Sequence, residues 1–183
     1  MDLAIVKEEL RRFLSDALRI AVVGIGQDYR QDDAVGIVIV EKLSEKLSGG
    51  SVPPLSLYDA EFSTAAGTVK LYQGYDTPEN LTGKLRRFMP THVLFVDAAQ
   101  LAERPGTLEL VPIAEIQGET LSTHDLPLSV LGEYLEKGMG SKVMLLGIQP
   151  LSIDMGPEYQ LSEPVLQGAE RATEMIFEVL MQP

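Results

Sequence analysis

Three residues of this chain have the types and positions expected of a site that contacts a metal ion. Asp33 lies in the acidic loop GIGQDYRQDDAVG (24–36), Asp97 ends the apolar segment VLFVD, and His124 lies in the loop sequence LSTHDLPL. Two carboxylates and one imidazole form a hard-to-borderline ligand set that suits Ni²⁺, Zn²⁺ or a similar ion. The three residues are dispersed along the chain, so only the fold can bring them together.

Each of these residues also has a structural interpretation. Asp33 lies at the junction of a loop and a helix, where a carboxylate could cap the helix by accepting bonds from free backbone N–H groups. Asp97 could cap its strand, although aspartate is a poor strand residue and strand ends often carry functional groups. An isolated loop histidine such as His124 is usually unremarkable. Asp32 is expected to cap or support Asp33, because neighbours at a helix start cannot both point into one site.

Other reactive groups are expected to lie outside this set. His92 begins the strand that Asp97 ends, so it is expected at the opposite edge of the sheet, in a structural or exposed position. The hydroxyl residues next to His124 are adjacent to it only in sequence, which does not supply the geometry of a catalytic triad. The chain has no GxSxG or HExxH motif. Asp28 is assigned no role.

The loop GIGQDYRQDDAVG also resembles a nucleotide-binding turn. Two glycines flank Ile25, but Tyr29 stands where a dinucleotide-binding motif needs its third glycine. No GK[ST] sequence follows, so the P-loop pattern fails as well. The three aspartates, Asp28, Asp32 and Asp33, would repel a phosphate. Nucleotide binding by an α/β protein therefore stays the weaker alternative.

Alternating apolar segments and helical patterns must position these residues. Short apolar segments predict strands at 19–26, 69–74, 91–98, 104–111 and 141–150. Helical spacing of apolar residues predicts helices at 6–18, 34–47, 78–88, 126–137 and 162–181. This alternation predicts a three-layer α/β/α fold with a central, twisted, mostly parallel sheet of about five strands. Ligands of such sheets gather beyond the carboxyl ends of the strands, where Asp33 and Asp97 are expected.

The length of the chain predicts one α/β domain over residues 1–183. Residues 1–18 are interpreted as an N-terminal helical extension. Residues 51–67, SVPPLSLYDAEFSTAAG, are interpreted as an insertion. The helix of the extension is expected to bury one stripe of four residues, Val6, Leu10, Leu14 and Leu18.

Composition excludes several classes of function. A formal net charge of −12 argues against nucleic acid and against an anionic membrane surface, which both require Lys and Arg. The absence of cysteine excludes disulfides, thiolate metal sites and a cysteine nucleophile. The charged, helix-patterned N-terminus is not a signal peptide, and no apolar segment approaches about 20 residues. These features predict a soluble cytoplasmic protein without membrane insertion.

Four sequence blocks resemble the nickel–iron hydrogenase maturation proteases, the endopeptidases that trim the hydrogenase large subunit. The blocks are GIGQDYRQDDAVG, HVLFVDAAQLAERPGTLELV, LSTHDLPLSVL, and LLGIQP followed by LSEPVLQGAERATEMIFEVL. They occur in the family's order and cover most of residues 19–181. The STHDLPL and GIQP sequences are most similar to the hydrogenase-3 maturation branch.

This resemblance implies both the reaction and the residues that perform it. Asp33, Asp97 and His124 would be the catalytic and metal-contacting residues. The partner would be the hydrogenase large-subunit precursor, whose C-terminal extension is cleaved after nickel insertion. The nickel would be supplied by the substrate as a recognition element, with other divalent cations as substitutes in isolation.

Two positions depart from the family pattern. Gln27 stands where the family usually has Asn, which keeps the amide. Gln73 stands where an Asp is expected before the second helix, and this puts the role of that position in doubt. A non-catalytic nickel- or precursor-binding maturation module therefore stays open as the alternative function.

Overall fold

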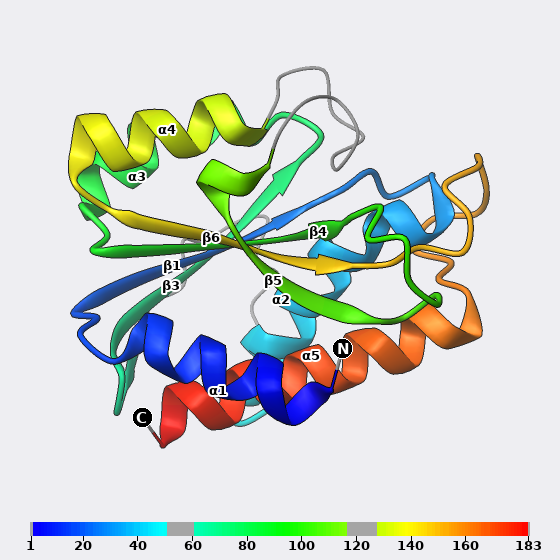
Figure 1. The fold of residues 1–183 in the computed structure, drawn as a ribbon, viewed down its shortest axis with the longest axis horizontal. Helices are drawn as coiled ribbons and strands as arrows, with labels where there is room; N and C mark the ends of the chain where they lie inside the picture. The colour runs from blue at the N-terminus through cyan, green and yellow to red at the C-terminus, as the bar shows by residue number, and fades with distance from the viewer. Residues whose placement is uncertain (1, 51–60, 117–127, 183) are drawn as a thin grey trace.

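A mixed β-sheet forms the centre of the structure, a computed structural model that describes residues 2–50, 61–116 and 128–182 (Figure 1). Within these ranges the sheet has six strands in the order β2-β3-β1-β4-β6-β5. The strands are β1 (Arg19–Ile25), β2 (Glu61–Thr64), β3 (Gly67–Tyr75), β4 (His92–Ala98), β5 (Leu108–Pro112) and β6 (Lys142–Ile148).

The four central strands are parallel, and the two outer strands are antiparallel to their neighbours. β1 pairs with β3 and β4, and β4 pairs with β6, all in parallel. β2 and β5 close the two edges as antiparallel strands. All seven residues of β4 are buried, which its uninterrupted apolar sequence predicts for a strand covered on both faces.

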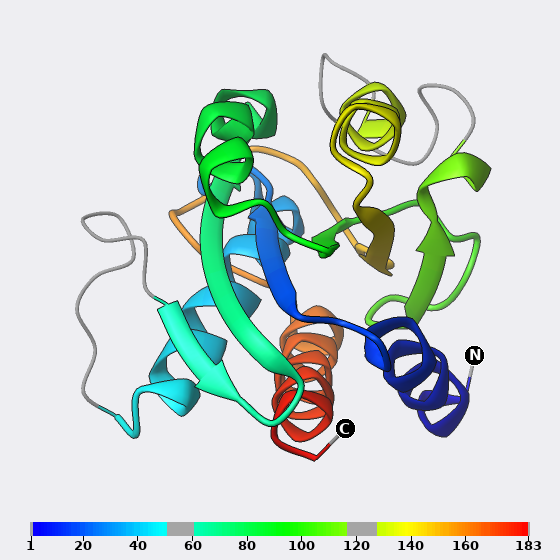
Figure 2. The ribbon, with the colours of Figure 1, turned by 90° about the vertical axis from the view of Figure 1, so that its left-hand side faces the viewer.

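Helices cover both faces of this sheet, and Figure 2 shows the two layers on opposite sides. The apolar core is accordingly divided into two clusters, one on each face. One layer contains α1 (Leu3–Leu14), α2 (Val35–Leu47) and α5 (Glu163–Met181), and the other contains α3 (Thr82–Phe88) and α4 (Leu128–Met139). The predicted three-layer, mostly parallel α/β fold is confirmed.

The described helices are amphipathic rather than apolar on all sides. In α2, Val35, Ile39 and Leu43 are buried, as their four-residue spacing predicts, while Glu45 is exposed. Among the described residues, no helix is both long and apolar enough to cross a membrane.

The strand beyond the expected five is β2, which forms a hairpin with β3. Residues 51–60 of the expected insertion lie outside the described residues, whereas 61–64 pair antiparallel with β3. The turn between the strands contains Ala65 and Ala66 and ends at Gly67, which has a positive φ of 129°. Alanines are not turn residues, so the sequence carried only a weak signal for this hairpin.

The N-terminal helix ends earlier than its apolar spacing predicts. Val6, Leu10 and Leu14 are buried, but α1 ends at Leu14 and the Leu18 side chain is 71% exposed. The Leu18 N–H instead binds Thr91 Oγ1 at 3.0 Å, because the chain is already turning into β1. The assignment of Leu18 to the helix and its buried stripe was therefore wrong.

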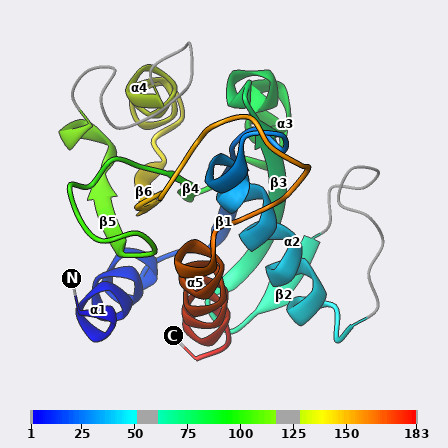
Figure 3. The ribbon, with the colours of Figure 1, turned by 90° about the vertical axis from the view of Figure 1, so that its right-hand side faces the viewer.

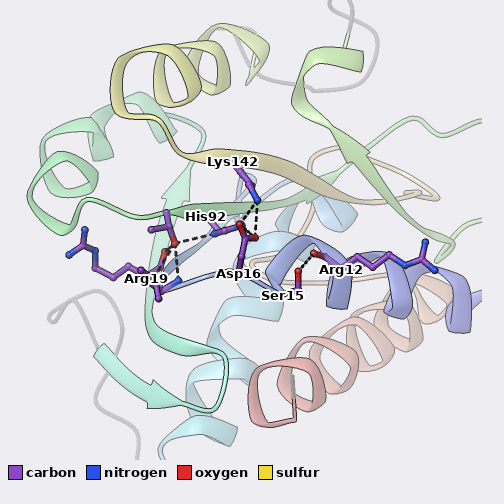
Figure 4. A network of polar contacts seen from close by, with 8 residues as sticks. Arg12, Ser15, Asp16, Arg19, His92 and Lys142 are labelled. Carbon is purple, nitrogen blue, oxygen red and sulfur yellow. Dashed lines mark hydrogen bonds and ion pairs between the residues drawn. The ribbon is translucent and has the colours of Figure 1, made fainter.

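His92 lies at the amino end of β4, the sheet edge opposite Asp97, and is buried (Figure 4). Its Nε2 lies 3.3 Å from Asp16 Oδ1, and its Nδ1 lies 3.0 Å from Thr91 Oγ1. Lys142 donates to both oxygens of Asp16, at 2.8 and 2.6 Å. His92 is thus a structural residue of the core rather than an exposed one.

Protonation of His92 is expected to destabilise the fold. Burial lowers the pKa of His92 below its ordinary value of 6.5. The attraction of Asp16 opposes this effect, whereas the positive charge of Lys142 lowers the pKa further. Below pH 6.5 the unfolded chain therefore binds this proton more readily than the folded protein. The free energy of unfolding should be highest above this pH and decrease as the pH falls through the folded pKa. Urea titrations between pH 7.5 and 5 should show a smaller decrease for His92→Gln; equal decreases would contradict the assignment.

Candidate active site

Glycines let the start of α2 approach the ends of two strands closely. Gly24 is the penultimate residue of β1, and a Cβ there would overlap the carbonyl of Gly36 in α2. A Cβ on Gly36 would overlap the carbonyl oxygen of Val96 in β4. Gly26 has a positive φ of 139°, and its missing side chain leaves room for the backbone of Asp33. The glycines of the loop thus serve backbone packing, which removes the main reason to expect a phosphate there.

The Asp33 side chain is fully buried and lies against its own loop. Its Oδ2 accepts a hydrogen bond from Gln27 N at 2.9 Å, and its N–H donates to Arg30 O at 3.0 Å. A 3₁₀ turn (Gln31–Ala34) separates this loop from α2, whose N-cap is Ala34. The interpretation of Asp33 as the helix cap is therefore wrong, because the extra turn moves the cap position beyond it.

Asp97 lies at the carboxyl end of β4 and is also fully buried. β1 and β4 are adjacent and parallel, with Gly24 opposite Val96, so both strands end at the same edge of the sheet. The 3₁₀ turn that carries Asp33 contacts β4. Two buried carboxylates are thus placed at one sheet edge, and burying charged groups is costly unless a cation or hydrogen bonds stabilise them.

The third predicted residue, His124, lies outside the described residues. Within 2–50, 61–116 and 128–182, no three His, Cys, Asp or Glu side chains are grouped closely enough to hold a metal ion. Asp33 and Asp97 can supply oxygen ligands, which suit a hard or borderline cation. That Asp33, Asp97 and His124 together contact a metal ion stays a prediction.

Asp32 supports the site by tying its loop to a distant segment. Its Oδ2 accepts hydrogen bonds from Leu151 N at 2.8 Å and Ser152 N at 3.1 Å. Ser162 donates to the same carboxylate twice, from N to Oδ1 at 2.6 Å and from Oγ to Oδ2 at 2.9 Å. Asp32 therefore has the supporting role expected of it, while Asp33 points elsewhere. The sequence could not show which segment Asp32 holds.

Gln73 forms a hydrogen bond with Glu41 on α2, a residue that sequence reasoning missed. Gln73 Nε2 donates to Glu41 Oε1 at 2.8 Å, and Gln73 Oε1 accepts from Tyr75 Oη at 3.2 Å. Burial raises the pKa of Glu41, an effect that the hydrogen bond from Gln73 opposes. An acidic residue at position 73 would face the Glu41 carboxylate and repel it, whereas the amide of Gln73 donates a hydrogen bond to it. Nothing in the helical pattern around Glu41 distinguishes it from an exposed helix residue.

Replacing Gln73 with glutamate should therefore destabilise the protein at neutral pH. The substitution loses a hydrogen bond to a carboxylate and adds a like charge, which together should cost about 1–3 kcal/mol of the free energy of unfolding. Repulsion raises the folded pKa of the pair above that of the unfolded chain, so the loss should diminish as the pH falls toward 5. Urea unfolding at pH 7.5 and 5 measures both effects.

Gln167→Glu is the matched control for this substitution. Gln167 also donates to a glutamate, Glu163, at 2.8 Å, but on the exposed face of α5. Solvent screens that pair, so its substitution should change stability by less than about 0.5 kcal/mol. Equal effects of the two substitutions would contradict the role assigned to Gln73 and Glu41.

Comparison with known proteins gives matches over most of the chain. A family model described as hydrogenase maturation protease (HycI) matches residues 60–179, a range that includes Asp97 and His124. A Methanocaldococcus jannaschii protein assigned as a hydrogenase maturation protease is 32% identical over 179 residues, covering 96% of each chain. The hydrogenase 3 maturation protease of Escherichia coli is 26% identical over 147 residues, covering 80% of this chain and 81% of the relative.

A solved structure also shares this fold. The crystal structure of the [NiFe] hydrogenase maturation protease HycI from Thermococcus kodakarensis superposes with a TM-score of 0.75. The two chains are 32% identical, and the match covers 94% of this chain and 98% of the other. The similarity therefore extends over nearly the whole length of both chains.

Proposed function

The chain belongs to the hydrogenase maturation protease family, and on this premise we propose that it is an endopeptidase acting on a nickel–iron hydrogenase large-subunit precursor. It removes the C-terminal extension of the precursor after nickel has been inserted. The reaction is hydrolysis of one peptide bond, so the enzyme is a hydrolase.

The observation that carries this proposal is the pair of buried carboxylates, Asp33 and Asp97, at the carboxyl edge of the sheet. Oxygen ligands at a sheet edge can contact a cation that a partner protein presents to them. The proposal assigns Asp33, Asp97 and His124 to the nickel of the precursor. Nickel is then part of the substrate, and contact with it holds the C-terminal extension in a fixed position for cleavage.

The competing function is a module that binds nickel or the precursor without cleaving it. Gln73, which departs from the family pattern, first suggested this alternative. The hydrogen bond from Gln73 to Glu41 gives this departure a local structural reason and weakens the argument for lost activity.

Intact-mass spectrometry of nickel-loaded precursor distinguishes the two functions. The protease should shorten the precursor by the mass of its C-terminal extension, with multiple turnovers at substoichiometric enzyme. A stable complex with a precursor of unchanged mass would instead identify the binding module. Heat-inactivated protein serves as the blank.

A further inference from the structure

Two segments at the carboxyl edge of the sheet are joined into one surface, here named the platform and defined as residues 27–32 and 151–162. Figure 3 shows the segment between β6 and α5 (orange) passing beside the segment between β1 and α2 (blue). Beyond the bonds of the Asp32 carboxylate, four hydrogen bonds join them. They are Asp32 N to Ser152 O at 3.1 Å, Arg30 Nε to Ile153 O at 3.1 Å, Gly156 N to Tyr29 O at 2.9 Å, and Tyr159 N to Asp28 O at 2.7 Å.

This platform holds three large apolar side chains in solvent. Tyr29 is 48% exposed, Leu151 is 61% exposed and Met155 is 72% exposed. The hydrogen bond from Gly156 N to Tyr29 O brings the backbone next to Met155 close to that of Tyr29, and Leu151 binds the Asp32 carboxylate through its N–H. Exposed apolar groups on a surface whose backbone is held by hydrogen bonds are typical of an interaction site, since less conformational entropy is lost when a partner binds.

The platform is continuous with the candidate active site. Asp32, which ties its two segments together, directly precedes Asp33 in the sequence. A protein that packs on the platform therefore lies next to the carboxylates at the ends of β1 and β4. Figure 3 shows the same relation, because the platform segments lie over the end of β1.

We propose that Tyr29, Leu151 and Met155 form the docking surface for the folded body of the large-subunit precursor, separate from the tail that is cleaved. This inference rests on the proposed function and adds the surface that selects the substrate. Two acidic residues of the platform, Asp154 and Glu158, are also exposed. The surface therefore fits an apolar patch with a basic rim. Two copies of this chain, each with a net charge of −12, would bring like charges together on the same face.

The double variant Leu151→Ser/Met155→Ser tests the docking surface. Loss of two apolar contacts at an interface should raise KM for nickel-loaded precursor at least about 10-fold. The kcat at saturating precursor should stay within about 2-fold, since neither side chain belongs to the predicted metal-contacting set. Binding of the same precursor, measured by biolayer interferometry, should weaken in proportion to KM.

Leu18→Ser is the matched control, because Leu18 is 71% exposed but lies at the opposite edge of the sheet. This substitution should leave KM unchanged. An unchanged KM in the double variant, or an equal rise in the control, would overturn the docking surface. Light scattering that shows a wild-type dimer and a monomeric double variant would overturn it too, by assigning the surface to self-association. If wild-type protein binds the precursor without cleaving it and the double variant fails to bind, the proposed protease function fails and the docking surface stands.

Discussion

Asp97→Asn is expected to abolish removal of the C-terminal extension while leaving the protein folded. The substitution keeps the size of the side chain and removes only the charge with which Asp97 would contact the nickel of the precursor. Loss of one essential acid–base or metal-contacting group lowers rates by about 10²–10⁴-fold. Because asparagine has nearly the same size and shape as aspartate, the variant should still fold. Single-turnover cleavage and thermal unfolding measure the two quantities on the same preparations.

Asp76→Asn provides the matched control for Asp97. Asp76 follows the carboxyl end of β3, at the same sheet edge, but its side chain is exposed. This control should cleave the precursor at the wild-type rate. Wild-type cleavage by Asp97→Asn would remove Asp97 from the site, and an unfolded variant would show that its carboxylate is structural.

Asp32→Ala is expected to cause the largest loss of stability among the acidic residues of the loop. The Asp32 carboxylate is fully buried and accepts four hydrogen bonds from Leu151, Ser152 and Ser162. Its removal leaves four partly buried donors without this acceptor, which should cost about 3–5 kcal/mol. For a chain of this length, that loss lowers Tm by roughly 6–20 °C. Differential scanning calorimetry measures the change.

Asp28→Ala is the control for this loss, because Asp28 holds the platform through its backbone carbonyl, which accepts from Tyr159 N at 2.7 Å. Its Tm should stay within a few degrees of the wild type. Limited proteolysis should cut the Asp32→Ala variant first within 151–162, where the support is lost. A Tm equal to that of Asp28→Ala would show that Asp32 does not hold the platform.

The sequence predicted the elements that bury continuous apolar segments. β1, β4 and β6 are covered on both faces, so their residues are almost uniformly apolar and their positions were recognisable. β2 was harder to recognise, because it is a four-residue edge strand whose burial alternates between exposed and half-buried residues. Leu18 was misassigned because periodicity cannot show where a tertiary contact, here with Thr91, ends a helix.

Positions in the site were easier to predict than contacts. The placement of Asp33 and Asp97 at one edge of the sheet was predictable because parallel strands end at a common edge, a property of the fold class. The partners of Asp32 lie 119 to 130 residues further along the chain, so no local pattern could reveal them. Glu41 was missed for a similar reason, since its contact with Gln73 joins two elements that each follow an ordinary pattern.

The dependence of cleavage on substrate-borne nickel tests the central claim most directly. One preparation of precursor should be divided into nickel-free, nickel-loaded and nickel-restored samples, and incubated with the same wild-type protein. We predict mass loss of the C-terminal extension in the nickel-loaded and nickel-restored samples and an intact precursor in the nickel-free sample. Equal cleavage of all three samples would contradict the proposal that the enzyme recognises its substrate through nickel.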